Sequence, residues 1–180
     1  MSIPGIEVHQ ALPRDARQIQ EVFYHTWLAT YPNDKAGITE DDIREHCKNW
    51  LADESIKKLS EYLEDPNPDN MLLTAKEGDK VVAACRVGEP QLDNFNWLYA
   101  LYVLPEYQRR GVGSELWAGM QYLFNPRKPV RVGVTSYNTK AQAFYGKLGF
   151  VAQAITFYNP RLRMKGGNFI PSKWMIRHAG

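Results

Sequence analysis

A turn rich in glycine and arginine, near the middle of the chain, has the composition of an anion-binding site. It follows the apolar run 101–104 and reads Gln108-Arg109-Arg110-Gly111-Val112-Gly113-Ser114, where a helix is expected to begin. The first turn of a helix has unpaired backbone N–H groups and the positive end of the helix dipole, so it attracts phosphate. Glycine at 111 and 113 keeps Cβ atoms away from those amides, and Ser114 adds a hydroxyl donor.

Two common phosphate-binding motifs do not fit this turn. The dinucleotide fingerprint requires a third glycine, but residue 116 is leucine. The phosphate loop of nucleotide hydrolases requires Gly-Lys followed by Ser or Thr, which is absent. A tight turn with close helix packing, and no ligand, remains an alternative.

The pattern of apolar residues predicts the elements that must position this turn. Helices are expected over residues 13–31, 39–51 and 56–63, the second opened by a capping box at Thr39. Strands are expected at 6–9, 71–76, 81–87 and 97–103, with a hairpin connection at 77–80. Helix 111–124, strand 130–135, helix 139–148, strand 151–157 and strand 173–178 follow, with a loop over 159–171. This order predicts an α/β (α+β) fold, with a mixed sheet and helices on both faces.

Two motifs in this order resemble those of the GNAT superfamily of acyl-CoA N-acyltransferases. Residues 108–113 resemble its Gln/Arg-x-x-Gly-x-Gly/Ala signature. One strand later, its second signature is matched by Asn138, Ala141, Phe144-Tyr145 and Lys147-Leu148-Gly149-Phe150. The resemblance implies a GNAT-like fold, with a mostly antiparallel central sheet and a splayed pair of fourth and fifth strands. It also implies that residues 1–180 form one N-acetyltransferase domain.

The resemblance further implies acetyl-CoA as co-substrate, no metal, and a role for each matching residue. Tyr145 would be the general acid near the thioester sulfur, although packing beside Phe144 and Phe150 is an alternative. Asn138 would hydrogen-bond the pantetheine arm. The cofactor would otherwise be bound by backbone groups of Leu101, Tyr102 and Val103, facing the acetyl carbonyl and pantetheine amide, and by those of Arg109, Arg110, Gly111, Val112, Gly113 and Ser114, holding the pyrophosphate.

The acceptor is expected to be an amine of a small molecule or a peptide, attacking the thioester directly. In folds of this type the first helix, the loop after it and the fourth strand wall the acceptor pocket, which nominates Trp27, Tyr31, Trp97 and Tyr99. Aromatic faces attract cations, so these residues are expected to hold a cationic amine. Core packing is the alternative, above all for Trp27, which falls on the apolar helix face.

No carboxylate occurs on the expected fourth or fifth strand near the thioester. Glu89 and Asp93 are the nearest acids in sequence, and solvated loop charges are the simpler interpretation for both. A chain of water molecules is the alternative route for the proton. His25 is expected at the surface, and Cys85 is expected as a buried apolar filler.

Composition favours a cytoplasmic globular protein. Of 180 residues, 44% are hydrophobic and 23% charged, the net charge is +2, and there are two cysteines. These values exclude a disulfide framework and give no reason to expect nucleic acid or a membrane as partner. Neither a signal peptide nor a membrane span is expected. The three basic residues Arg161, Arg163 and Lys165 are too few for a nucleic-acid footprint. A CoA-binding sensor without turnover and a homodimer both remain open.

Overall fold

The computed structural model describes residues 3–88 and 94–179. Across these residues one sheet has the strand order β1-β2-β3-β4-β5-β7-β6. The strands are β1 (Ile6–Gln10), β2 (Met71–Glu77), β3 (Lys80–Gly88), β4 (Asn96–Val103), β5 (Val130–Thr135), β6 (Val151–Arg163) and β7 (Phe169–Arg177). The α-helices are α1 (Ala16–Thr30), α2 (Glu40–His46), α3 (Asp53–Glu64), α4 (Val112–Met120) and α5 (Thr139–Lys147). Short 3-10 turns are η1 (Pro13–Asp15), η2 (Asp34–Ala36), η3 (Pro68–Asn70), η4 (Pro105–Tyr107) and η5 (Gln121–Leu123).

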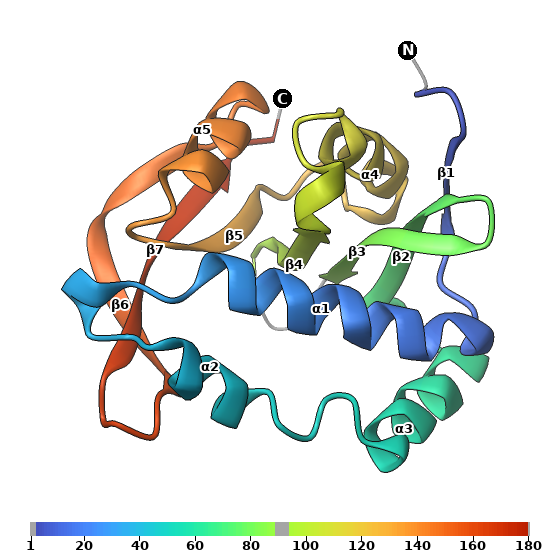
Figure 1. Ribbon diagram of the computed structural model, residues 1–180. Coiled ribbons are helices and arrows are strands. Elements are labelled where there is room, and N and C mark those ends of the chain that lie inside the picture. The colour runs from blue at the N-terminus through green and yellow to red at the C-terminus, as the bar shows by residue number, and fades with distance from the viewer. Residues whose placement is uncertain (1–2, 89–93, 180) are drawn as a thin grey trace.

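The predicted fold class is confirmed. Every neighbouring pair of strands in the sheet is antiparallel except β4 and β5, which run parallel. Figure 1 shows α1, α2 and α3 on one side of the sheet and α4 and α5 on the other. The sheet is therefore mixed and mostly antiparallel, with helices on both faces.

Local signals in the first half of the chain act as predicted. The Thr39 hydroxyl accepts a hydrogen bond from the Asp42 amide at 3.0 Å, and the Asp42 carboxylate accepts one from the Thr39 amide at 3.0 Å. This capping box opens α2, as expected. Strands β2 and β3 meet in the expected hairpin, with Glu77 opposite Lys80. Helix α2, however, ends at His46 and not near residue 51, because the chain turns at the buried Cys47.

The expected loop over residues 159–171 is wrong, because strand continues through most of it. β6 runs to Arg163, which lies opposite Phe169 of β7 in the register. The segment has no regular alternation of apolar and polar residues, and it contains Pro160 and two glycines, at 166 and 167. β6 is one of the two edge strands of the sheet, where a proline without an N–H need not cost a ladder hydrogen bond. The two glycines form only the tip of this β6–β7 hairpin.

The tip of the hairpin packs on α2 and the turn before it. Asn168 Nδ2 donates to the Gly37 carbonyl at 2.8 Å, and the Gly166 amide donates to the Asp42 carboxylate at 3.3 Å. Behind these bonds is a small buried cluster, made of Trp27, Ile38, Ile43, Cys47, Met164 and Ile170. Met164 and Ile170, on either side of the hairpin tip, are buried in this cluster. Their burial holds the hairpin against the first half of the chain.

The main core lies on both sides of the central strands. Its fully buried members include Ile19 and Val22 of α1, Leu98 of β4, and Leu116 of α4. Cys85 is also fully buried there, and burial raises the pKa of its thiol to about 12. In the described part of the chain, no helix has the length and apolar character that crossing a membrane requires.

Candidate active site

The parallel strands β4 and β5 separate partway along their length. Their register pairs Asn96 with Val130, Trp97 with Arg131, and Leu98 with Val132, and it extends no further within the described residues. At the same point β4 contains a bulge, because Val87 of β3 lies opposite Leu98 but Arg86 lies opposite Ala100. A bulge bends its strand. The outer half of β4, residues 99–103, therefore leaves β5, and the predicted splay is present.

The hydrogen bonds of β4 show which backbone groups face this opening. The Leu104 amide donates to the Val82 carbonyl of β3 at 3.0 Å. Backbone groups alternate in direction along a strand, so those of Tyr102 also face β3, and those of Leu101 and Val103 face the opening. The Val103 carbonyl accepts a hydrogen bond from Gln108 Nε2 at 3.0 Å. Of the three predicted strand residues, the structure therefore directs Leu101 and Val103 toward the splay.

The turn before α4 presents a row of unused amides. Arg109 has a φ of 63° and Gly111 a φ of 89°, both in the left-handed region that glycine adopts without steric cost. The Ser114 and Glu115 amides donate to the Gly111 carbonyl at 2.8 and 3.1 Å. Among the described residues, no carbonyl accepts from the amides of residues 109–113. Five consecutive N–H groups are thus available to an anion at this helix start.

The two arginines of the turn differ in their surroundings. Arg110 lies 3.3 Å from the Glu77 carboxylate and 4.6 Å over the Tyr107 ring centroid. The Tyr107 hydroxyl donates to Glu77 at 2.7 Å, and this bond, more than Arg110, lowers the pKa of Glu77. Arg109 is exposed and forms no ion pair with any described residue. Arg109 is therefore the more available of the two cations for a ligand.

Asn138 is the N-cap of α5. Its Oδ1 accepts a hydrogen bond from the Ala141 amide at 3.0 Å, which satisfies one of the free amides at the helix start. The side-chain Nδ2 carries two further donors, and no described residue accepts from them. Asn138 therefore has a structural role that sequence analysis did not assign, and it keeps donors for the predicted one.

Tyr145 is packed between two aromatic rings. Its ring centroid is 5.1 Å from that of Phe144 and 5.4 Å from that of Phe150, and only 5% of the residue is exposed. Burial first, and then Tyr102 and Cys85, raises the pKa of Tyr145. No described residue shares a hydrogen bond with its hydroxyl. Tyr145 is thus both a core aromatic and a protonated donor.

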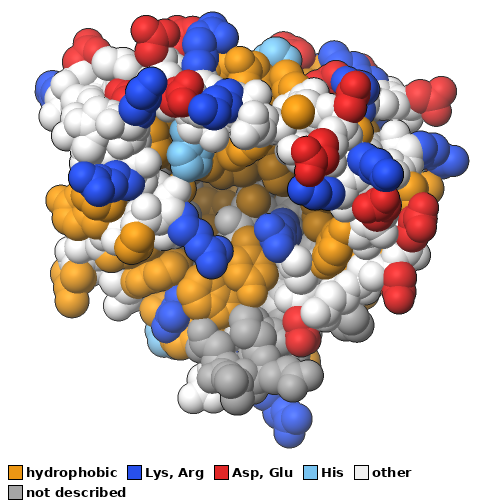
Figure 2. All heavy atoms as spheres, turned by 90° about the horizontal axis from the view of Figure 1, so that it is seen from below, with side chains coloured by type: hydrophobic (Ala, Val, Ile, Leu, Met, Phe, Trp, Pro, Cys, Tyr) orange, Lys and Arg blue, Asp and Glu red, His pale blue; other side chains and the backbone are white. Residues whose placement is uncertain are grey.

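The four predicted acceptor residues form two separate pairs. The rings of Trp27 and Tyr31 lie 4.4 Å apart, and those of Trp97 and Tyr99 lie 5.6 Å apart. Trp27 is only 7% exposed and belongs to the small buried cluster, whereas Tyr99 is 43% exposed. Figure 2, which views the molecule from the side of α1, α2 and α3, shows a hollow with hydrophobic side chains inside it and Lys or Arg side chains at its edge.

The β4 rings already lie against the protein's own cations. The Arg131 guanidinium is 3.5 Å from the ring centroid of Phe95, 5.3 Å from that of Trp97, and 5.4 Å from that of Trp174. Arg86 lies 5.7 Å over Tyr99. Each contact is of the cation–π type. The guanidinium groups of Arg86 and Arg131 therefore already contact the Tyr99 and Trp97 rings, which were predicted to bind a cationic acceptor.

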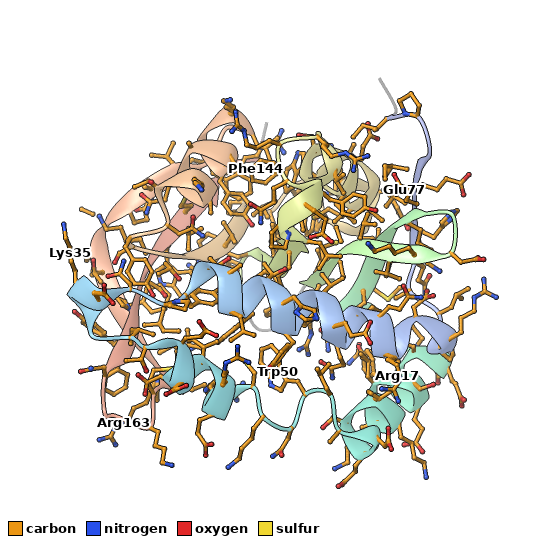
Figure 3. All side chains as sticks on the ribbon, in the orientation of Figure 1. Arg17, Lys35, Trp50, Glu77, Phe144 and Arg163 are labelled. Carbon is orange, nitrogen blue, oxygen red and sulfur yellow. The ribbon has the colours of Figure 1, made fainter. Side chains whose placement is uncertain are left out.

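Two residues outside the predicted site, His46 and Trp50, extend the aromatic group around Trp27. The His46 ring stacks on Trp27 at 5.2 Å and 4°, and Trp50 meets Trp27 edge-on at 5.0 Å. Figure 3 labels Trp50, below α1 in this view. Burial lowers the pKa of His46. One histidine at the end of a short helix carries no sequence signal for this stack. Glu89 and Asp93 lie outside the described residues.

Comparisons with known proteins identify solved structures with a similar fold. The structure is similar to the PaiA N-acetyltransferase of Thermoplasma acidophilum in complex with coenzyme A, with a TM-score of 0.70, 20% identity and 99% of each chain covered. It is also similar to an acetyltransferase of Thermus thermophilus, with a TM-score of 0.62, 18% identity, and coverage of 98% of this chain and 99% of that one. A third similar structure is yncA of Salmonella typhimurium with its cofactor acetyl-CoA, with a TM-score of 0.64, 19% identity, and coverage of 98% and 95%.

At these identities the similar structures establish the fold alone. A search of the curated proteins gives no match. The sequence model of the Acetyltransferase (GNAT) family, however, matches residues 21–150, which is more than half of the chain. The chain therefore belongs to the acetyltransferase (GNAT) family.

Proposed function

We propose that residues 1–180 act as one N-acetyltransferase domain that moves an acetyl group from acetyl-CoA to a primary amine of a small molecule or a peptide. One observation carries the proposal. Three features occur together: the β4–β5 opening that the backbone groups of Leu101 and Val103 face, five unused amides at the start of α4, and the hydroxyl of the mostly buried residue Tyr145. Such an arrangement can bind a phosphate, hold an extended arm along a strand and donate to a reacting thioester.

The turn before α4 would bind the pyrophosphate. The free amides of residues 109–113 would donate to the anion, and the exposed Arg109 would add charge. Asn138 Nδ2 would donate to the pantetheine arm. Backbone groups of Leu101 and Val103 would pair with the amides of that arm, as a strand edge pairs with an extended peptide.

The same strand edge would stabilise charge during the reaction. The amine nitrogen attacks the thioester carbon, so negative charge develops on the carbonyl oxygen, and a fixed N–H of Leu101 can donate to it. The carbon–sulfur bond then breaks, the amine loses a proton, and the sulfur gains one. The raised pKa of Tyr145 keeps its phenol protonated and ready to donate to the sulfur. Burial disfavours a bare thiolate in the same place, which increases the value of that donor.

The acceptor would enter the hollow on the side of α1 and α2 (Figure 2). The prediction that Trp27, Tyr31, Trp97 and Tyr99 hold a cation remains a prediction. The positions of Arg131 and Arg86 argue against cation binding by Trp97 and Tyr99, because both guanidinium groups place positive charge at these rings. The described parts of β4 and β5 carry no carboxylate, so the proton of the attacking amine would leave through water.

A screen tests the proposal. Purified protein is mixed with acetyl-CoA and a panel of amines, amino acids, polyamines and peptides, and the released CoA thiol is measured. At least one acceptor should give saturable release with acetylated amine as product. Binding of CoA in calorimetry, without turnover on any acceptor, would contradict the proposed transferase activity and favour a CoA-binding sensor. The sensor is the second candidate because the described parts of β4 and β5 carry no carboxylate.

A further inference from the structure

Three tyrosines span the opening between β4 and β5. Tyr137 follows β5, and its hydroxyl donates to the Tyr31 carbonyl at the end of α1 at 2.6 Å. The Tyr31 hydroxyl lies 3.1 Å from the hydroxyl of Tyr102, which is in the outer half of β4. Tyr31 therefore uses two of its polar groups to connect one arm of the splay to the other.

Other hydrogen bonds hold each arm separately. On the β5 side, the Ser136 amide donates to the Pro171 carbonyl of β7 at 2.8 Å. On the β4 side, Gln108 Nε2 donates to the Val103 carbonyl. Within the described residues, one hydrogen bond connects residues 133–138 with the end of α1 or with the outer half of β4. It is the bond from the Tyr137 hydroxyl to the Tyr31 carbonyl. This bond and the Tyr31–Tyr102 hydrogen bond thus span the opening beyond the point where the β4–β5 ladder ends.

The bridge is partly buried and adjoins the predicted general acid. Burial is the main cause that raises the pKa of Tyr31 and of Tyr102, so both phenols are neutral. Tyr145 is among the groups that raise the pKa of Tyr31, and Tyr102 raises that of Tyr145. The hydroxyl of Tyr145 therefore lies within electrostatic reach of the bridge.

We propose that Tyr31, Tyr102 and Tyr137 are positioning residues that fix the width of the splay, and so the distance between the Leu101 amide and the Tyr145 hydroxyl. This inference rests on the proposed function, in which those two groups donate to the same thioester. Catalytic donors must be held within fractions of an ångström, and a misplacement of about 1 Å can cost about 100-fold in rate. Hydroxyls that join two otherwise separate strands can supply that restraint.

Tyr137→Phe tests the bridge, because it removes only the donor to Tyr31. Single-turnover acetyl transfer should slow by about 10- to 100-fold, while the calorimetric Kd for CoA stays within about twofold. A second readout needs no cofactor: amide hydrogen exchange of residues 99–103 and 133–138 should become faster in the unliganded protein. The variant Tyr102→Phe should act in the same direction, and the double variant should lose less than the product of the two single effects.

Tyr62→Phe is the matched control. The Tyr62 hydroxyl donates to the Asn70 carbonyl in the α3–η3 region, and this hydrogen bond joins neither β5 nor the end of α1. Its removal costs a similar hydrogen bond but should leave transfer within about twofold of wild type. If Tyr137→Phe leaves both the transfer rate and the hydrogen exchange unchanged, the proposal that the bridge positions the strands is overturned. It is also overturned if Tyr62→Phe slows transfer as much as Tyr137→Phe does. Failure of the proposed function is distinct: the wild type would then transfer no acetyl group, while hydrogen exchange would still decide whether the bridge restrains the strands.

Discussion

Phe144 packs against Gly113 so closely that a Cβ atom built on the glycine would lie 3.2 Å from the phenylalanine ring. Leu101 of β4 is the next neighbour, at 3.7 Å. Figure 3 shows Phe144 between α5 and α4. The second glycine of the motif thus permits the two helices and the splayed strand to meet, in addition to any approach of phosphate.

Gly113→Ala should therefore destabilise the protein although alanine favours helix. Overpacking of a tight contact typically costs about 1–3 kcal/mol, against a gain of about 1 kcal/mol from helix propensity. We expect a net loss of about 1 kcal/mol in the free energy of unfolding, measured with urea. Adding Phe144→Leu should restore part of it, since the smaller side chain leaves room for the methyl group. A more stable Gly113→Ala protein would contradict the close contact.

Arg109→Gly should weaken CoA binding without harming the fold. The residue has a φ of 63°, which glycine adopts freely, so the substitution removes the guanidinium and relieves the backbone. Loss of one exposed charge near phosphate is worth about 0.2–1 kcal/mol, or about a 1.5- to 5-fold rise in the calorimetric Kd. The effect should shrink at high salt. Arg109→Lys, which keeps the charge, is the control and should retain most of the affinity.

Short-range signals made much of this fold predictable. The capping box at Thr39 and the hairpin at Glu77 and Lys80 depend on residues next to each other in sequence, and both are present. The start of α4 at Val112 likewise follows from its glycines and the apolar strand before it. At such places local conformational preference and the final fold agree.

Long-range relationships could not be predicted in the same way. Pro160 indicates a loop unless the strand that contains it is known to be an edge, and that depends on the order of all seven strands. Tyr137 meets Tyr31 across 106 positions of sequence, and no period or spacing connects them. The stack of His46 on Trp27 depends on how α2 packs against α1. Tertiary packing decides each of these contacts.

His46 should make stability depend on pH. Burial lowers its pKa in the folded protein, so the unfolded chain takes up a proton more readily near the ordinary histidine pKa of about 6.5. The stability linked to this group is present above that pH and is lost as the pH falls through the lower folded pKa.

Urea unfolding at pH 7.5 and pH 5.0 measures this effect. Wild type should lose more free energy of unfolding between the two values than His46→Gln, since carboxylates contribute equally in both proteins. His25→Gln, at an exposed position of α1, is the control and should behave as wild type. Equal losses in wild type and His46→Gln would remove the buried histidine from the pH dependence.

Tyr145→Phe separates a general acid from a core aromatic. The ring contacts with Phe144 and Phe150 remain in the variant, and no described residue loses a hydrogen bond, so the free energy of unfolding should change little. If the hydroxyl donates to the leaving sulfur, single-turnover transfer should slow by about 100-fold, the lower end of general acid catalysis, because a thiolate is a fairly good leaving group. The Kd for CoA should stay within about twofold. Tyr122→Phe, which removes a hydroxyl from a residue that is 74% exposed, should leave rate and affinity unchanged. A Tyr145→Phe rate within about twofold of wild type would leave Tyr145 a packing residue and assign proton delivery to solvent.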